Sequence, residues 1–161
     1  MFNFKTDTYL KLIFIVSLIA LFFAYFIEYI LGHQPCNLCL IERIPYGLTL
    51  ILLFINYILK KNERFIILVL VVIFIFSFLI SFYHFGIEQS FFEESAVCAS
   101  KNSMDIISKE DLLKQLSVKT ISCKDVTFRI FGLSLTSINI LINLIITIVL
   151  TKIYIKYENI K

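Results

Sequence analysis

The sequence predicts an all-α membrane protein, a four-helix transmembrane bundle with a long outer loop that carries a short amphipathic helix. Of the 161 residues, 59% are hydrophobic, and the mean hydropathy is +0.89. A soluble domain of this length leaves roughly 30% of its unfolded surface exposed to water, and so apolar a chain would have to expose hydrophobic side chains there. The length fits a single domain.

Four segments are long and apolar enough to cross the hydrocarbon core of a bilayer, which takes roughly 20 residues of helix. They are residues 10–31, 44–59, 65–85 and 131–154. The second segment is short unless flanking residues join it. The first is too long for the core of a signal peptide and lacks a small-x-small cleavage site, so we expect it to be retained as a span.

Lysine and arginine near the span ends predict the orientation, because cytoplasmic loops of membrane proteins are enriched in both. They gather before the first span, between the second and third, and after the fourth: Lys5, Lys11, Lys60, Lys61, Arg64, Lys152, Lys156 and Lys161. We therefore expect both termini in the cytoplasm, with residues 32–43 and 86–130 on the outer face. The net charge of +3 is scattered, which does not favour nucleic-acid binding.

All four cysteines fall in the two outer segments, and the outer side of a bacterial membrane is where disulfides persist. Cys36 and Cys39, in the stretch PCNLCLIER, close a very small ring, and a strained bridge is more oxidising than a structural one. The second span begins just beyond Cys39, so its N-terminal dipole would favour a thiolate there. Arg43, one helical turn on, could stabilise this thiolate or a bound oxidant, or could extend to the lipid headgroups.

Cys98 and Cys123 have 24 residues between them, and a bridge here could be structural or could take part in redox chemistry. Four cysteines permit three pairings, and sequence alone does not choose among them. The loop between Cys98 and Cys123 predicts a short amphipathic helix, with Ser108 as its N-cap and an apolar face that includes Leu112 and Leu116. Such a helix could lie on the membrane surface and hold the loop near the first pair.

Zinc binding is the main chemical alternative to redox chemistry, because four thiolates can form a tetrahedral site. Structural sites of that kind usually use two close-spaced cysteine knuckles. The chain has one such knuckle, at Cys36 and Cys39. We therefore predict no metal site.

Three segments, in order and at matching places among the spans, resemble the DsbB family, the quinone-dependent oxidases of periplasmic thiol–disulfide proteins. They are PCNLCLIER after the first span, YHFGIEQSFFEESAVC after the third, and ISCKDVTFRIFGLSLTSINILIN leading into the fourth. The resemblance covers nearly the whole chain and implies a multi-pass protein of the bacterial inner membrane. Leu40 and Ile41 stand where many relatives carry aromatic residues, which leaves the choice of quinone open.

The resemblance also implies a path for electrons. A reduced, DsbA-like protein of the thioredoxin fold would attack a Cys98–Cys123 disulfide, with Cys98 forming the mixed disulfide, and Cys123 would then attack Cys36. The released Cys39 thiolate would engage a membrane quinone, ubiquinone or menaquinone, with Arg43 beside it. The protein would thus join a water-soluble electron donor to a lipid-soluble acceptor.

Several polar residues of the spans admit two interpretations. His84, at the end of the third span, is a candidate for the quinone pocket or for proton handling, or else an interfacial histidine satisfied by headgroups or water. Glu28 either reaches the interface or takes part in a proton relay, and Glu88 lies one turn beyond His84. Asn139 and Asn143 share one face of the fourth span, where interhelical hydrogen bonds are expected.

Two other functions compete with the thiol oxidase. A quinone reductase resembling vitamin K epoxide reductase would typically keep its active pair on the last span, and the fourth span here has no cysteine. A structural or metal-binding membrane protein stapled by two disulfides would leave Cys36 and Cys39 inert. That alternative explains neither Arg43 nor the clustering of the cysteines on one side, so we favour the oxidase.

Overall fold

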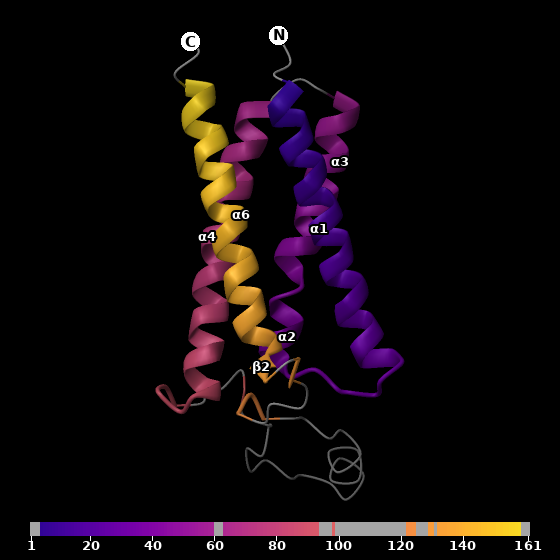
Figure 1. Ribbon diagram of the computed structural model, residues 1–161, viewed down its shortest axis with the longest axis vertical. Coiled ribbons are helices and arrows are strands. Elements are labelled where there is room, and N and C mark those ends of the chain that lie inside the picture. The colour runs from indigo at the N-terminus through magenta and orange to yellow at the C-terminus, as the bar shows by residue number, and fades with distance from the viewer. Residues whose placement is uncertain are drawn as a thin grey trace, which may run out of the picture.

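The computed structural model describes residues 4–59, 63–93, 98, 122–124, 129–130 and 132–158, and four long helices dominate this part of the chain (Figure 1). The helices are α1 (Phe4–Tyr29), α2 (Asn37–Ile41), α3 (Ile44–Leu59), α4 (Glu63–Glu88) and α6 (Leu135–Glu158), and the strands are β1 (Arg129–Ile130) and β2 (Leu133–Ser134). Four of these stretches are long and apolar enough to cross a membrane: Thr6–Tyr29, Asn37–Leu59, Glu63–Glu88 and Leu135–Lys156. The predicted all-α membrane bundle is confirmed.

The second and fourth of the predicted spans begin at other residues in the structure. The second span, which is short if it begins at residue 44, includes the short helix α2 and runs over Asn37–Leu59. The fourth was predicted to begin at residue 131, and this was wrong: Arg129 pairs with Ser134, and Ile130 with Leu133, in an antiparallel hairpin. An apolar run of this length does not distinguish strand from helix, and Gly132 provides the positive φ of 84° at the turn.

The start of α6 is fixed by a side-chain cap. Ser134 Oγ accepts a hydrogen bond from the Ser137 backbone N–H at 3.2 Å, which satisfies one of the donors that a helix N-terminus leaves unpaired. The helix therefore begins at Leu135, immediately after the hairpin. This places the first turn of α6 beside the last turn of α4, where Thr136 donates a hydrogen bond to Glu88.

All four long helices contribute to one apolar core. Its fully buried members are Ile13, Ile67, Leu70, Phe74 and Leu150. The outward-facing positions are also apolar, since Phe22, Phe76 and Ile145 are each at least 60% exposed. Water-soluble proteins rarely expose such extended apolar surface, whereas helices that face lipid do. The protein is a multi-pass membrane protein.

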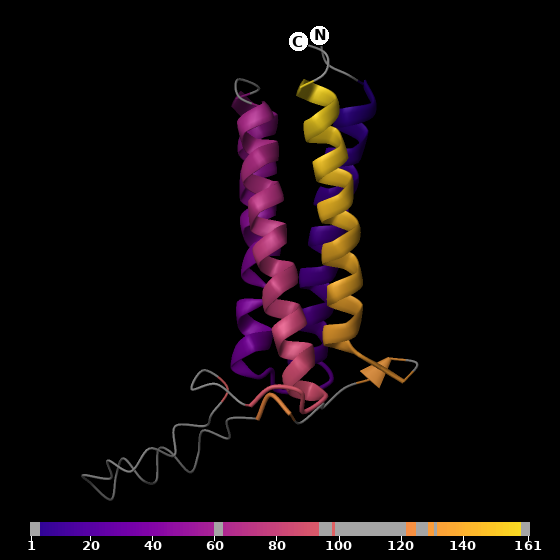
Figure 2. The same ribbon diagram turned by 90° about the vertical axis from the view of Figure 1, so that its left-hand side faces the viewer.

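The helices form a ring in which one contact is weak. α6 packs chiefly against α4, α1 chiefly against α3, and α3 against α4, whereas α1 and α6 have the least contact of these neighbours. α1 diverges from α6 toward the end of the bundle that carries α2 and β2 (Figure 1). The start of α1 and the end of α6 lie together at the opposite end (Figure 2).

We call the end that carries α2 and β2 the cysteine end. It comprises the described residues 29–43, 84–93, 98, 122–124, 129–130 and 132–136. All four cysteines lie there, at the opposite end of the bundle from the start of α1 and the end of α6. The amphipathic helix predicted around Ser108 lies outside the described residues.

Candidate active site

The first cysteine pair is built on the N-terminus of α2. Cys36 is the N-cap residue, with extended backbone (φ −72°, ψ 168°), and its sulfur accepts a hydrogen bond from the Cys39 backbone N–H at 3.3 Å. The two side-chain sulfurs lie 2.9 Å apart, and both cysteines are free thiols. We expected the helix to begin beyond Cys39; because α2 begins at Asn37, Cys36 is the cysteine at the helix N-terminus.

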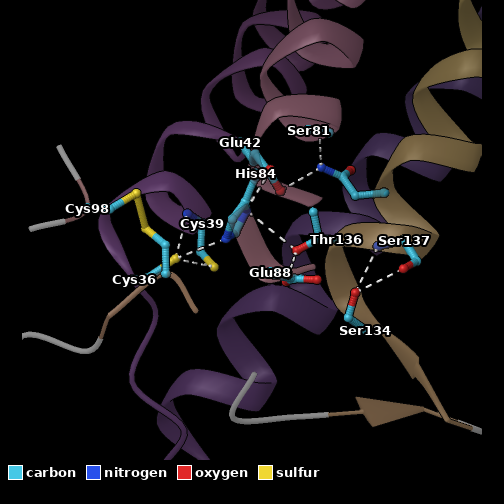
Figure 3. Close-up of polar contacts among 12 residues, drawn as sticks. Cys36, Cys39, Glu42, Ser81, His84, Glu88, Cys98, Ser134, Thr136 and Ser137 are labelled. Carbon is cyan, nitrogen blue, oxygen red and sulfur yellow. Dashed lines mark hydrogen bonds and ion pairs between the residues drawn. A yellow bond between two sulfur atoms is a disulfide. The ribbon is translucent and has the colours of Figure 1, made fainter. Parts of the chain in front are cut away.

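The second pair is a disulfide that packs against the first. Cys98 and Cys123 are bonded with a Cα–Cα distance of 5.5 Å, and both are buried. They share one buried cluster with Cys36, Leu38 and Ile87. Figure 3 shows the disulfide beside Cys36. A segment far along the chain is therefore brought into contact with the first pair.

A hydrogen-bonded chain leads from Cys36 into the bundle. His84 Nε2 lies 3.5 Å from Cys36 Sγ, and His84 Nδ1 lies 2.9 Å from Glu42 Oε1. Asn139 Nδ2 donates to Glu42 Oε2 at 2.8 Å, so both oxygens of this carboxylate have partners (Figure 3). His84 is 1% exposed. Ionisable groups are costly at such depth and usually mark a functional site.

The contacts around Cys36 favour its thiolate. Hydrogen bonds with the Cys39 and His84 side chains and the charge of His84 together lower the pKa of the Cys36 thiol from 9.0 to about 4, although burial acts in the opposite direction. The thiolate is the form of cysteine that attacks disulfides and other electrophiles. These contacts therefore favour Cys36 as the candidate nucleophile of the reduced pair.

Arg43 points into the bundle and is paired there. Its guanidinium forms an ion pair with Glu28 of α1 and lies 5.0 Å from the centre of the Tyr25 ring. Both charged side chains are largely buried, at 14% and 21% exposure. The ion pair gives Glu28, near the C-terminal end of α1, a partner of opposite charge.

The two cysteine pairs border a pocket of about 380 Å³. Its apolar wall comes from α1 and α6, the two neighbours with the least mutual contact: Ala20, Phe23, Ala24, Ile27, Leu135, Ile138 and Ile142. Its polar groups include Thr136 and Asn139 of α6 and, from other segments, Cys36, Cys39, Glu42, Arg43, His84, Glu88 and Cys123. An apolar pocket with a few convergent polar groups is the usual form of a small-molecule site.

Comparison with known proteins agrees with this geometry. Residues 6–153 match the family described as "Disulfide bond formation protein DsbB". The chain belongs to the DsbB family. It is also similar to the uncharacterized protein RP370 of Rickettsia prowazekii (strain Madrid E), with 31% identity over 151 residues that cover 91% of this chain and 88% of the relative. DsbB-family membership makes the protein a component of disulfide bond formation, with thiol–disulfide oxidoreductase activity.

The six candidate residues from the sequence are all found at the cysteine end of this DsbB-family protein. Cys36, Cys39, Cys123, Arg43 and His84 line the pocket, and Cys98 is bonded to Cys123. Asn139 and Asn143 form the expected interhelical hydrogen bonds, because both amides donate to Ser81 Oγ of α4.

Sequence reasoning missed Glu42, the carboxylate that orients His84. Two signals could have identified it. Glu42 is an acidic residue inside an apolar stretch, where charge is expensive, and it lies three residues after Cys39, on the same helical face. Tyr46 was also missed; its hydroxyl donates to Asn143 Oδ1 at 3.0 Å and joins the second span to the fourth.

Proposed function

We propose that this protein reoxidises a DsbA-like dithiol protein of the thioredoxin fold and passes the electrons through its two cysteine pairs to a membrane quinone. One observation carries the proposal. The Cys98–Cys123 disulfide and the free Cys36–Cys39 pair share one buried cluster, and the free pair borders an apolar pocket. Membership of the DsbB family supports the same reaction.

The partner's electrons enter at the disulfide by thiol–disulfide exchange. A partner thiolate attacks Cys98 Sγ, the Cys98–Cys123 bond breaks, and Cys123 leaves as a thiolate. Cys123 attacks Cys36 of an oxidised Cys36–Cys39 pair, which releases Cys39. The partner's second thiol then displaces Cys98, and Cys98 attacks Cys123 and frees Cys36. The partner has lost two electrons and two protons, and Cys36 and Cys39 have gained them.

These steps return the Cys98–Cys123 disulfide and leave the other pair reduced, which is the arrangement of bonds in the structure. Cys36 and Cys39 then give up two electrons and two protons and form their own disulfide. The quinone accepts these two electrons and two protons and departs as quinol. Thiol exchange is thereby joined to a lipid-soluble acceptor.

The pocket fits the head group of a quinone, either ubiquinone or menaquinone. Its apolar wall suits an aromatic ring, its volume lies in the range of small-molecule sites, and α1 and α6 have little mutual contact, which supports entry from the bilayer. Arg43 and His84 offer N–H donors to a carbonyl oxygen. Cys39 and Arg43 both line this pocket.

In this cycle His84 receives the proton of the Cys36 thiol, and Glu42 orients the His84 ring. His84 Nε2 accepts the proton that leaves the thiol, and Glu42 Oε1 accepts a hydrogen bond from Nδ1–H, which fixes the orientation of the ring. Glu88 lines the same pocket, and its Oε2 has no hydrogen-bond partner among the described residues. This free carboxylate oxygen can receive a proton when the pair is oxidised.

The location follows from the same chemistry. The cysteine end faces the periplasm of a bacterial cell, the two termini lie in the cytoplasm, and the spans cross the inner membrane. Described cationic side chains at the opposite end, Arg64, Lys152 and Lys156, support this orientation. The partner and the cysteine pairs then share an oxidising compartment.

The test is anaerobic quinone absorbance after mixing purified protein, a short-chain quinone and excess reduced DsbA-like partner. We expect quinone loss with the wild type and none with Cys36→Ser or Cys98→Ser. The Cys98→Ala/Cys123→Ala variant separates the two half-reactions. Dithiothreitol, a small reductant that can reduce the Cys36–Cys39 pair directly, should still drive quinone loss in this variant. The partner protein should not, because the disulfide that it attacks is missing.

A folded wild type that leaves the quinone untouched with both reductants would refute the proposal and favour the stapled structural protein. Quinone loss that persists in Cys36→Ser would show that electrons bypass the Cys36–Cys39 pair. Circular dichroism of each detergent-solubilised variant checks that its helical content is unchanged.

A further inference from the structure

Three potential metal ligands meet at the cysteine end of the bundle. The ligand atoms of Cys36, Cys39 and His84 all lie within 4.8 Å of one another. The pair has the cysteine-x-x-cysteine spacing of a zinc knuckle, and the backbone N–H of Cys39 bonds to Cys36 Sγ at 3.3 Å. The sequence offered one knuckle and no second; the structure supplies His84 from α4, 48 residues away, as a third ligand.

The distances suit a tetrahedral zinc ion after a small adjustment. With Zn–S bonds of about 2.3 Å and Zn–N bonds of about 2.0–2.1 Å, tetrahedral geometry sets sulfur and nitrogen ligands about 3.6 Å apart and two sulfur ligands about 3.8 Å apart. Cys36 Sγ and His84 Nε2 are 3.5 Å apart. The two sulfurs, at 2.9 Å, must separate by about 0.9 Å to reach that tetrahedral spacing, which a rotation of the half-buried Cys39 side chain can provide.

The surroundings of His84 match those of a metal-bound histidine. A histidine that binds zinc through one ring nitrogen almost always donates the other N–H to a carboxylate or carbonyl. His84 Nδ1 lies 2.9 Å from Glu42 Oε1, and Asn139 holds the second oxygen of Glu42. Nε2 is therefore the nitrogen that faces the sulfurs. Structural sites close all four positions, whereas this cluster has three ligands, and all three residues line the pocket.

We infer that the reduced Cys36–Cys39 pair and His84 bind one Zn²⁺ ion, with Glu42 orienting the histidine, and that the bound ion blocks the pair. Binding forms two Zn–S bonds and one Zn–N bond, and it releases both the proton held between the two sulfurs and the proton held by His84 Nε2, because the ligands bind the metal in their deprotonated forms. No electron moves, because Zn²⁺ has no redox chemistry in proteins. The metal and the Cys36–Cys39 disulfide are mutually exclusive, since each uses both sulfurs.

The binding test does not depend on catalysis. The full chain carrying Cys98→Ala/Cys123→Ala is reduced, freed of quinone and titrated with Co²⁺, whose thiolate charge-transfer and ligand-field absorption report tetrahedral sulfur ligation. We expect saturation at one equivalent and displacement of Co²⁺ by one equivalent of Zn²⁺. The same protein oxidised to the Cys36–Cys39 disulfide should give no such absorption.

Matched variants identify the ligands. Glu42→Gln should weaken Zn²⁺ binding about 10- to 100-fold, the usual cost of losing an outer partner of a metal-bound histidine, and His84→Leu should weaken it more. His33→Leu removes the other histidine of the chain and should leave the affinity unchanged. Absence of thiolate–cobalt absorption in the reduced protein, or an unaltered affinity in His84→Leu, overturns the inference.

The inhibition part of the inference rests on the proposed oxidase function. Zn²⁺ should protect Cys36 and Cys39 from alkylation and should stop dithiothreitol-driven quinone loss, and a chelator should restore both. A metal-free protein that never reduces quinone refutes the oxidase and leaves the cobalt result standing. A metal-free protein that is active, binds no Co²⁺ and is unaffected by Zn²⁺ refutes the metal site alone.

Discussion

Replacement of His84 by leucine should raise the pKa of the Cys36 thiol. His84 Nε2 lies 3.5 Å from the sulfur, and its hydrogen bond and charge both lower that pKa. A hydrogen bond to a charged group is worth about 1.5–3 kcal/mol, and one pKa unit corresponds to about 1.36 kcal/mol. His84→Leu should therefore move the pKa from about 4 to about 5–6.

The same loss should make the Cys36–Cys39 disulfide harder to reduce. A thiolate that is less stabilised makes the reduced pair less stable relative to the disulfide, and 30 mV corresponds to about 1.4 kcal/mol for two electrons. The reduction potential of His84→Leu should thus fall by about 30–60 mV at neutral pH. Glu42→Gln, which keeps a hydrogen-bond acceptor for His84 but removes the charge, should give a smaller change.

The assay uses the Cys98→Ala/Cys123→Ala background, so that Cys36 and Cys39 are the only thiols, with a chelator present to exclude metals. Ultraviolet thiolate absorbance is followed as the pH is lowered, and the potential is measured in dithiothreitol redox buffers. Because the pKa of Cys36 is lowered, its thiolate persists as the pH falls below 9.0 and is lost near pH 4 in the protein with His84. His33→Leu is the control.

An unchanged midpoint in folded His84→Leu would refute the reasoning, because the imidazole would then contribute nothing to the thiolate. A titration midpoint of Cys36 that is lower in His84→Leu than in the protein with His84 would refute it as well. A raised midpoint with an unchanged potential would mean that the disulfide form is destabilised to the same extent, and the proposed role of His84 in the redox balance would have to be abandoned.

Two further predictions concern packing and charge at the cysteine end. A Cβ added at Gly86 would collide with the Phe92 ring, so Gly86→Ala should lower the free energy of unfolding by about 1–3 kcal/mol. Gly47→Ala, whose added Cβ meets open space, should not lower it. Equal melting temperatures of the Gly86→Ala and Gly47→Ala variants would contradict this prediction. Arg43→Gln leaves Glu28 without its partner and should cost about 1–3 kcal/mol. Adding Glu28→Gln should recover most of that stability, and a double variant as unstable as the single one would argue against the pair.

The sequence was sufficient to predict the four spans because lipid imposes a simple rule on long apolar helices. The prediction failed where hydropathy does not determine the structure. The predicted fourth span included Leu133 and Ser134, but these residues form a strand, because Gly132 takes a positive φ and Ser134 caps α6. Hydropathy also carries no information on which helices meet, so the contact between Glu42 and His84 could not be derived from a single sequence.

The candidate cysteines were predictable from their one-sided distribution and spacing, but the direction of proton movement requires the structure. Both oxygens of Glu42 are engaged, by Asn139 and by His84 Nδ1, so a proton on His84 is held from the other side by the Cys36 thiolate. In the proposed cycle, disulfide formation removes that negative charge, and Nε2 loses the anion that retains its proton. The exit is then on the Nε2 side, where His84 and Glu88 line the same pocket. Electrons and protons therefore leave the pair in the same direction, as the formation of a neutral quinol requires.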